Sequence, residues 1–286
     1  MNLYYRILLK FLLTFIGIIL ISALPALFDG MKLDISSYLS EVGSIGSSLV
    51  HPESITYGHF QTTYFLFPGI WARWRYSMIL LFVSFIITFL LALGLTLITI
   101  MVTKKIRKTI RIILFIGASI PDIFVIGLSI ITAIFIHKHT NIPFFSIASF
   151  GDNQIFMLPI IVLTILPTIF FYRTMIYDFE EEISRQYVDV AKSKGLSTYS
   201  ILFSHVLRNA VIHIFLHSKS IIWFMLSNLL MIEYAFNIDG LMRFMLTNDS
   251  SQILAIGLLS LFIPIYIMQA SVQIVIEKIT GKQVEV

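Results

Sequence analysis

A short polar interruption separates two long apolar segments of this chain, and it reads Tyr187-Val188-Asp189-Val190-Ala191-Lys192-Ser193-Lys194-Gly195-Leu196-Ser197. Three glutamates, residues 180–182, precede it, and Lys192 and Lys194 lie toward its end. Acidic side chains at the start of a helix and basic ones at its end complement the helix dipole. The order of charges therefore predicts a polar helix in this region.

Both ends of that helix carry sequence signals. We expect Asp178 to cap its start, because carboxylates accept hydrogen bonds from the free N–H groups of a first turn. Gly195 is expected to end it, since glycine readily adopts the left-handed conformation that closes many helices. Ser197 is placed to cap a following helix, with Leu196 packed on Ile201. The segment thus predicts a helix, a turn and a second helix that form a docking surface.

The composition is that of a membrane protein. Of the 286 residues, 57% are hydrophobic and 13% charged, and the mean hydropathy is +0.90, which is too apolar for a soluble domain. The apolar residues fall in blocks near the ~18 to 20 residues that cross a bilayer as helix, not in the short alternating strands of a barrel. We therefore predict an all-α integral membrane protein. The absence of cysteine excludes disulfides and thiolate metal sites.

Six apolar blocks are predicted to span the membrane, at about residues 7–28, 76–103, 110–136, 154–177, 210–236 and 253–276. The first is longer than the core of a signal peptide and is followed by further spans, so we expect it to be retained. Residues 29–75 lack clear periodicity and predict an external loop, as do residues 137–153. Pro121 predicts a kink within the third span. We predict three regions. Residues 1–75 form a first helix with its loop, residues 76–277 form a five-span core with the polar segment at 178–209, and residues 278–286 form a tail.

The distribution of basic residues predicts the topology. The densest basic cluster follows the second span, at Lys104, Lys105, Arg107, Lys108 and Arg111. Because cytoplasmic loops carry an excess of lysine and arginine, this cluster, the polar segment and both termini are expected in the cytoplasm. The net charge of +4 reports orientation rather than a nucleic-acid partner.

The polar segment also resembles a known motif, the EAA loop of ABC-importer permeases. That pattern, Glu-Ala-Ala, three residues, then Gly, aligns with Asp189, Val190, Ala191 and Gly195. The resemblance is closer to the oligopeptide and dipeptide branch, with Tyr-Val-x-x-Ala-x-x-Lys-Gly-Leu followed by His-x-Leu-Arg-Asn-Ala. The matching residues are Tyr187, Val188, Ala191, Lys194, Gly195, Leu196, His205, Leu207, Arg208, Asn209 and Ala210.

This resemblance implies a type I ABC-importer permease in a bacterial plasma membrane, working by alternating access. It implies four kinds of partner: a second related permease, two cytoplasmic ATPase subunits, an extracytoplasmic substrate-binding protein and the lipid bilayer. The ATPases would dock on the polar segment, which we call the coupling loop. Its expected contact residues are Tyr187, Asp189, Ala191, Lys192, Lys194, Gly195, Leu196, Arg208 and Asn209.

The chain itself carries no phosphate-binding loop. Gly281-Lys282 is followed by Gln283, not by Ser or Thr, and no strand precedes it. We therefore expect ATP and magnesium to bind partner subunits, and no catalytic, cofactor or metal site on this chain.

The cargo is the least determined property. The resemblance favours oligopeptides or dipeptides, with nickel, a metal chelate, an opine or another small solute as alternatives. It also suggests Glu233, Phe236 and Gly240 as part of the pathway or of an external gate, because a Glu precedes Phe-x-x-Pro-Gly-Leu-Gly at this place in that branch. Asp239 and Met242 depart from that pattern, so a structural role for this segment is at least as well supported.

Two functions of other classes remain open. An ion-coupled secondary transporter needs ionisable groups within the membrane, for which Glu233 and Asp122 are the candidates. An intramembrane hydrolase would use His213 and His217, yet two histidines are too few for a catalytic zinc site. We expect the two histidines to make interhelical or interfacial contacts instead.

Overall fold

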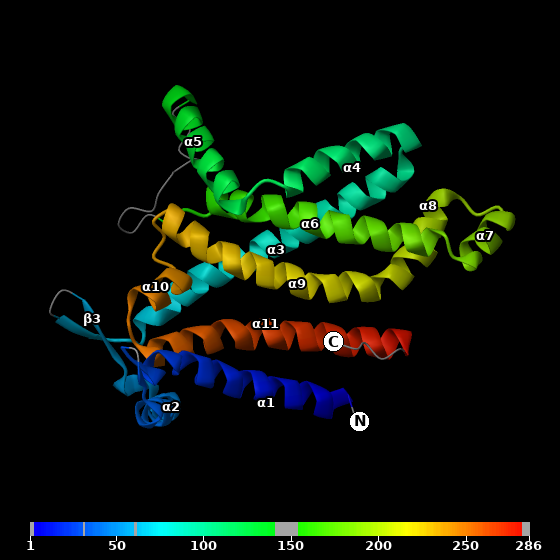
Figure 1. Ribbon diagram of the computed structural model, residues 1–286. Helices are drawn as coiled ribbons and strands as arrows, with labels where there is room; N and C mark the ends of the chain where they lie inside the picture. Colours follow the sequence, from blue (N-terminus) through cyan, green and yellow to red (C-terminus); the bar gives the residue numbers. More distant parts are fainter. Residues whose placement is uncertain (1–2, 31, 60–61, 141–153, 282–286) are drawn as a thin grey trace. The chain divides into compact units, whose positions relative to one another are not determined.

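The computed structural model describes residues 3–30, 32–59, 62–140 and 154–281, and it is dominated by long helices (Figure 1). The elements in chain order are α1 (Leu3–Ser22), η1 (Leu24–Leu27), β1 (Phe28–Asp29), β2 (Lys32–Leu33), α2 (Ile35–Val50), η2 (Pro52–Ser54), β3 (Thr56–His59), β4 (Thr62–Phe65), α3 (Gly69–Met101), α4 (Lys104–Ala118), α5 (Asp122–Thr140), α6 (Met157–Ile183), α7 (Gln186–Ser193), α8 (Thr198–Ile201), the π-helical η4 (Leu202–Val206), α9 (Leu207–Ala235), α10 (Leu241–Thr247) and α11 (Ser251–Thr280).

Long apolar helices confirm the predicted fold class. Within the described residues, five helical segments are long and apolar enough to cross a membrane: Leu3–Ser22, Gly69–Met101, Met157–Ile183, Thr198–Ala235 and Ser251–Ile279. The number becomes six if α4 and α5 together form one further span. The predicted external loop at 137–153 lies mostly outside the described residues, and α5 includes its first residues.

The chain forms two compact units. The first comprises Met1–Ile79 and Asp239–Ile274, and the second comprises Leu80–Ile238 and Val275–Val286. Helices α3 and α11 each contribute residues to both units.

The first unit contains a helix and two hairpins within residues 29–75, where the sequence showed no clear periodicity, while the external location of this segment stays a prediction. Helix α2 packs through Ile45 on Ala23 and Ala255, and two short antiparallel hairpins, β1–β2 and β3–β4, flank it. Asp34 caps α2, accepting hydrogen bonds from the backbone N–H groups of Ser36 at 3.0 Å and Ser37 at 3.1 Å. Hydrogen bonds from these serine hydroxyls hold the pKa of Asp34 well below its usual range.

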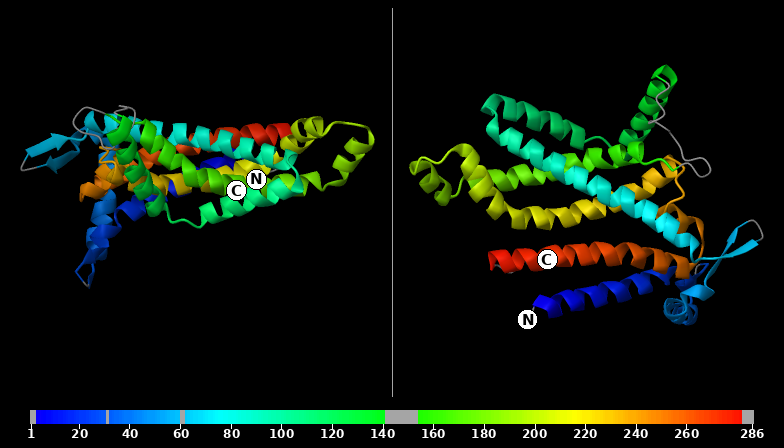
Figure 2. Two further views of the ribbon diagram at one scale, coloured as in Figure 1. Left: turned by 90° about the horizontal axis from the view of Figure 1, so that it is seen from above. Right: turned by 180° about the vertical axis from the view of Figure 1, so that it is seen from behind.

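Helices α6 and α9 form the packing centre of the second unit. They lie side by side in both views of Figure 2 and share an extended contact. Large buried side chains of α6, among them Phe171 and Phe179, and of α9, such as Met225, fill this unit. In a bilayer, the packing of such side chains stabilises a helical unit through van der Waals contact, because lipid tails are as apolar as the core itself.

The third predicted span is broken, not kinked. Helices α4 and α5 meet at an angle of 95°. Pro121 lies at the break, and its carbonyl accepts from the N–H groups of Phe124 at 3.0 Å and Val125 at 3.2 Å, so it begins α5. A proline has no N–H for the preceding helix and disfavours helical geometry in the residue before it. Helix α4 therefore ends at Ala118, before Pro121, instead of bending through the proline.

Candidate functional site

The coupling loop begins later than predicted. Helix α6 continues to Ile183, and the separate helix α7 starts at Gln186 with Arg185 as its N-terminal flanking residue. The prediction that Asp178 caps the polar helix was wrong, because Asp178 lies inside α6 with its side chain 8% exposed. Its carboxylate instead approaches the imidazole of His217 on α9, with Oδ2 and Nε2 3.2 Å apart.

The turn of the coupling loop forms as predicted. Gly195 has a φ of +76°, in the left-handed region, and its N–H donates to the carbonyl of Lys192 at 2.9 Å. Ser197 caps α8 by accepting from the N–H of Ser200 at 3.2 Å. Leu196 is half-exposed and its packing on Ile201 stays a prediction.

Tyr187 fastens α7 to the beginning of the next long helix. Its hydroxyl donates to Glu182 at 2.9 Å and hydrogen-bonds the side chain of Asn209. Its ring lies 6.5 Å from that of His205, which belongs to the π-helical turn η4. Burial raises the pKa of the Tyr187 hydroxyl, so it remains a donor at neutral pH. Three residues that match the motif, distant in sequence, are thus brought together.

Helix α7 has an inner and an outer face. Val188 and Ala191 are buried on the inner face. On the outer face Asp189 and Lys192 pair with each other at 3.2 Å, and Val190 is 54% exposed. Ala191 is therefore a packing residue, whereas the exposed side chains are available to a partner.

Exposed apolar side chains also lie on α8 and η4. Tyr199 is 60% exposed and stacks near Phe203, with ring centroids 4.4 Å apart. We call the exposed set of Val190, Leu196, Tyr199 and Phe203 the apolar docking patch. Sequence reasoning missed Tyr199 and Phe203, although aromatic residues within a polar loop were a usable signal.

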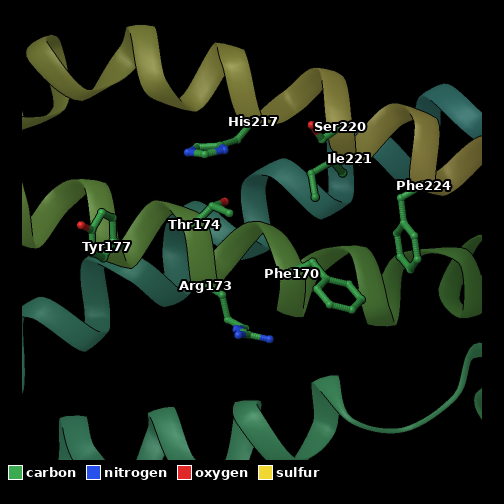
Figure 3. A pocket seen from close by; sticks show the side chains of 8 residues that line it. All are labelled: Phe170, Arg173, Thr174, Tyr177, His217, Ser220, Ile221 and Phe224. Atoms are coloured by element: carbon green, nitrogen blue, oxygen red, sulfur yellow. The ribbon is translucent and has the colours of Figure 1, made fainter.

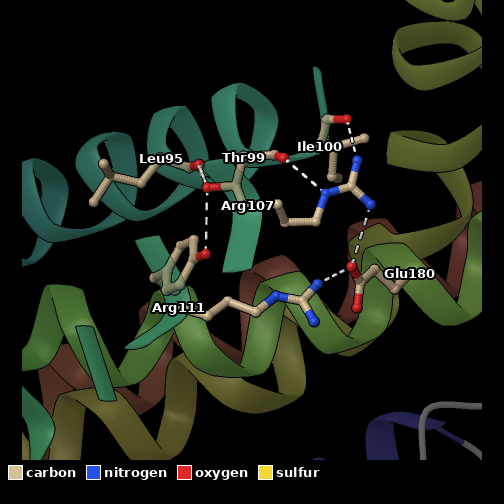
Figure 4. A network of polar contacts seen from close by, with 7 residues as sticks. Leu95, Thr99, Ile100, Arg107, Arg111 and Glu180 are labelled. Atoms are coloured by element: carbon tan, nitrogen blue, oxygen red, sulfur yellow. Dashed lines mark hydrogen bonds and ion pairs between the residues drawn. The ribbon is translucent and has the colours of Figure 1, made fainter. Parts of the chain in front are cut away.

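A polar network lies beside the coupling loop, and Figure 4 shows it. The guanidinium of Arg107 donates to the carbonyl of Thr99 at 3.1 Å and to that of Ile100 at 2.5 Å. These carbonyls belong to the last turn of α3, where cations complement the helix dipole. Glu180 near the end of α6 pairs with Arg107 at 3.6 Å and with Arg111. The network therefore connects α3, α4 and α6.

The same network borders the coupling loop. A hollow of about 410 Å³ is lined by Arg107 and Glu180 on one side and by Val188, Lys192 and Ile201 of the loop on the other. Sequence reasoning missed this arrangement: the basic cluster was assigned to topology alone, and residues 180–182 were assigned to a different helix.

The other residues predicted to have a functional role lie in different parts of the structure. Arg208 is exposed at the start of α9. Glu233 and Phe236 are fully buried at the end of α9, in the second unit, and Gly240 precedes α10 in the first. Asn237, with a φ of 52°, ends α9 in the left-handed conformation, and the N–H of Ile238 donates to the carbonyl of Glu233 at 2.8 Å. A role in a pathway or gate stays a prediction.

His217 makes an interhelical contact, as predicted. Its partner is Asp178 on α6, and His213 lies one turn away on the same helix. In the part of the chain that the structure describes, no three His, Asp or Glu side chains are grouped to hold a metal ion.

Comparison with known proteins gives two matches. The family described as "Binding-protein-dependent transport system inner membrane component" matches residues 94–279, well over half of the chain. The dipeptide transport system permease protein DppB of Lactococcus lactis subsp. cremoris (strain MG1363) is 30% identical over 125 residues. That match covers 44% of this chain and only 40% of DppB.

The family match includes the last two turns of α3, all of α4 to α10 and nearly all of α11, and thus the coupling loop and its polar network. Its description agrees with the apolar helices found in the structure. The chain belongs to the family of inner membrane components of binding-protein-dependent transport systems, and it is a multi-pass protein of the bacterial plasma membrane.

Proposed function

We propose that this chain is a permease subunit of an ATP-driven, binding-protein-dependent peptide importer. Its partners would be a second permease, two cytoplasmic ATPases and an extracytoplasmic substrate-binding protein. The observation that carries this proposal is the coupling loop itself, a helix-turn-helix with an apolar docking patch, fastened to α6 and α9 through Tyr187. Peptide cargo is supported by the dipeptide permease to which the chain is similar.

The apolar docking patch suits an ATPase groove. It lies in a segment rich in charged residues, where exposed apolar side chains mark interaction sites. Helix-in-groove contacts use apolar anchors on one helical face. In this proposal Val190, Tyr199 and Phe203 insert into the groove, and the Asp189–Lys192 pair borders it.

Movement of the docked loop would reach the membrane helices by two routes. One is covalent and direct, because α6 precedes α7 and α9 follows η4. The other is the Arg107–Glu180–Arg111 network, which connects the end of α6 to the end of α3. Packed helices of this kind shift as rigid bodies. A tilt of α7 would therefore displace α3, α6 and α9 together and switch access to the pathway.

The experiment replaces one exposed apolar residue of the patch by an acid. Val190→Glu is compared with Val50→Glu, since Val50 at the end of α2 is 70% exposed and lies far away in sequence. Both substitutions leave the buried core unchanged. The assays are co-purification of the ATPases with the tagged chain, and ATP-dependent uptake of a tripeptide into proteoliposomes.

We expect Val190→Glu to reduce ATPase retention and uptake by about 10-fold or more, because it places an unpaired carboxylate within the contact. Val50→Glu should retain the ATPases. Full retention and uptake in Val190→Glu would show that the patch is not the docking surface. Uptake that followed an ion gradient instead of ATP would indicate a secondary transporter.

A further inference from the structure

A cavity of about 620 Å³ opens between α6 and α9 in the second unit (Figure 3). Each helix lines it with side chains at spacings of three and four residues, the pattern of one helical face. The lining residues are Phe170, Arg173, Thr174 and Tyr177 of α6, and His217, Ser220, Ile221 and Phe224 of α9. Its volume falls within the range of about 300–1,000 Å³ that is typical of small-molecule sites.

Arg173 is the unusual member of this lining. It lies ten residues before Ile183, the last residue of α6, which places it about 15 Å inside the helix end at 1.5 Å per residue. Its guanidinium lies 5.4 Å from the ring of Phe115. Among the described residues, no carboxylate lies within ion-pair distance of Arg173. Asp178, five residues farther along α6, pairs with His217.

An arginine within an apolar helix requires a polar environment. Charged side chains in membrane spans face protein or a water-filled cavity and pair with an opposite charge. The aromatic contact with Phe115 does not neutralise the charge of Arg173, for which the described part of the chain supplies no carboxylate. Hydroxyl groups of Tyr177 and Ser220 on the same lining add hydrogen-bond donors, whereas the Thr174 hydroxyl donates to the carbonyl of Phe171. Arg173 points away from α9 (Figure 3), so it supplies positive charge at the α4 side of the lining, where an anionic group could be accepted.

We propose that this cavity binds the terminal carboxylate of the transported peptide through Arg173. This inference rests on the peptide-importer function proposed above. A guanidinium suits a carboxylate because its planar fork forms two parallel hydrogen bonds. Phe170 and Phe224, which form an edge-to-face pair with centroids 5.0 Å apart, provide an apolar wall for a neighbouring side chain of the peptide. A phospholipid phosphate offers the same anionic chemistry, so the test separates the two sources.

The absence of cysteine from this chain permits a direct test. Ser220→Cys places a single thiol in the lining of the cavity, and Ser47→Cys places one on α2 as the control. The assembled transporter, without ATP, is treated with a neutral maleimide in phosphatidylcholine vesicles. The rate of labelling is read on this chain with a tripeptide, with its C-terminal amide and with neither.

We expect the tripeptide at millimolar concentration to slow labelling of the Ser220→Cys thiol several-fold, and the amide to have little effect. The Ser47→Cys thiol should not be protected by either. Adding Arg173→Gln should weaken the protection by about 10- to 100-fold in peptide concentration, and Arg173→Lys should retain part of it.

Several results would overturn this assignment. They are equal protection by acid and amide, protection that persists in Arg173→Gln, or a Ser220→Cys thiol that the maleimide never reaches. Slower labelling in phosphatidylglycerol vesicles, without any peptide effect, would assign the anion to a lipid headgroup. The readout requires neither ATP hydrolysis nor uptake, so its failure is distinct from a failure of the coupling experiment on Val190.

Discussion

Gly195 is the position in the coupling loop where the backbone alone sets the cost of a substitution. Its φ is +76°, and a Cβ built on it would meet nothing within 4 Å. The effect of Gly195→Ala is therefore free of steric clash. A left-handed conformation costs an L-residue roughly 1–2 kcal/mol, which changes the balance between this turn and competing conformations by a factor of about 5–30.

The substitution series follows from the same reasoning. Gly195→Asn should cost less than Gly195→Ala, because asparagine tolerates the left-handed region, and the β-branched Gly195→Val should cost more. Gly46→Ala is the matched control. Gly46 lies within α2, its φ is not positive and its added Cβ also meets nothing, so alanine should be neutral or stabilising by about 0.5–1 kcal/mol.

The assays are thermal unfolding of the purified chain, hydrogen exchange of α7 and α8, and uptake per ATP hydrolysed in the assembled transporter. We expect Gly195→Ala to raise exchange in α7 and α8 and to reduce uptake per ATP, with a small change in global unfolding. The reasoning is refuted if Gly195→Ala and Gly46→Ala respond alike, or if Gly195→Val is as well tolerated as Gly195→Asn.

Two further predictions concern charged groups. Glu180→Gln removes both arginine pairs; because the Glu180 side chain is 34% exposed, we expect a loss of about 1 kcal/mol in thermal unfolding. It should also lower uptake while ATP hydrolysis continues, and unchanged uptake per ATP would contradict a coupling role for the network. The depressed pKa of Asp34 predicts that its carboxylate stabilises α2 above about pH 4, the usual value for aspartate, and that this contribution is lost as the pH falls below it. Hydrogen exchange of α2 should therefore speed up at low pH in the native chain and much less in Asp34→Asn; equal acceleration in both would contradict this origin.

Local signals in the sequence predicted the coupling loop well where they depend on the backbone of one or two residues. Gly195 and Ser197 behave as expected because a positive φ and a serine cap are decided locally. Asp178 was misassigned because capping preference is weaker than tertiary context: α6 continues past it, and His217 from a distant segment supplies its partner. The contact of Tyr187 with Asn209 likewise depends on how the helices pack.

Helix α2 could have been recognised from the sequence. The side chains that face its core, Tyr38, Val42, Ile45 and Leu49, follow a spacing of four, three and four residues, which is helical. Its many serines and glycines concealed this pattern, since such residues usually indicate loops. The cavity beside Arg173 was different, because it needs the register of α6 against α9, which no local pattern supplies.

The break at Pro121 changes where the basic cluster of α4 lies relative to the membrane-spanning helices. The predicted third span, residues 110–136, included Arg111 at its start, whereas α4 turns by 95° from α5 and keeps its basic turns apart from the apolar helix. Lysines 104, 105 and 108 are exposed on α4, as suits the headgroup region. Because Glu180 at the end of α6 pairs with both arginines, α4 and the coupling loop must lie at the same membrane surface. The positive-inside rule, applied to the cluster alone, then also predicts the side of the coupling loop; in the proposed transporter, an ATPase would therefore reach the surface where α3, α4 and α6 are held together.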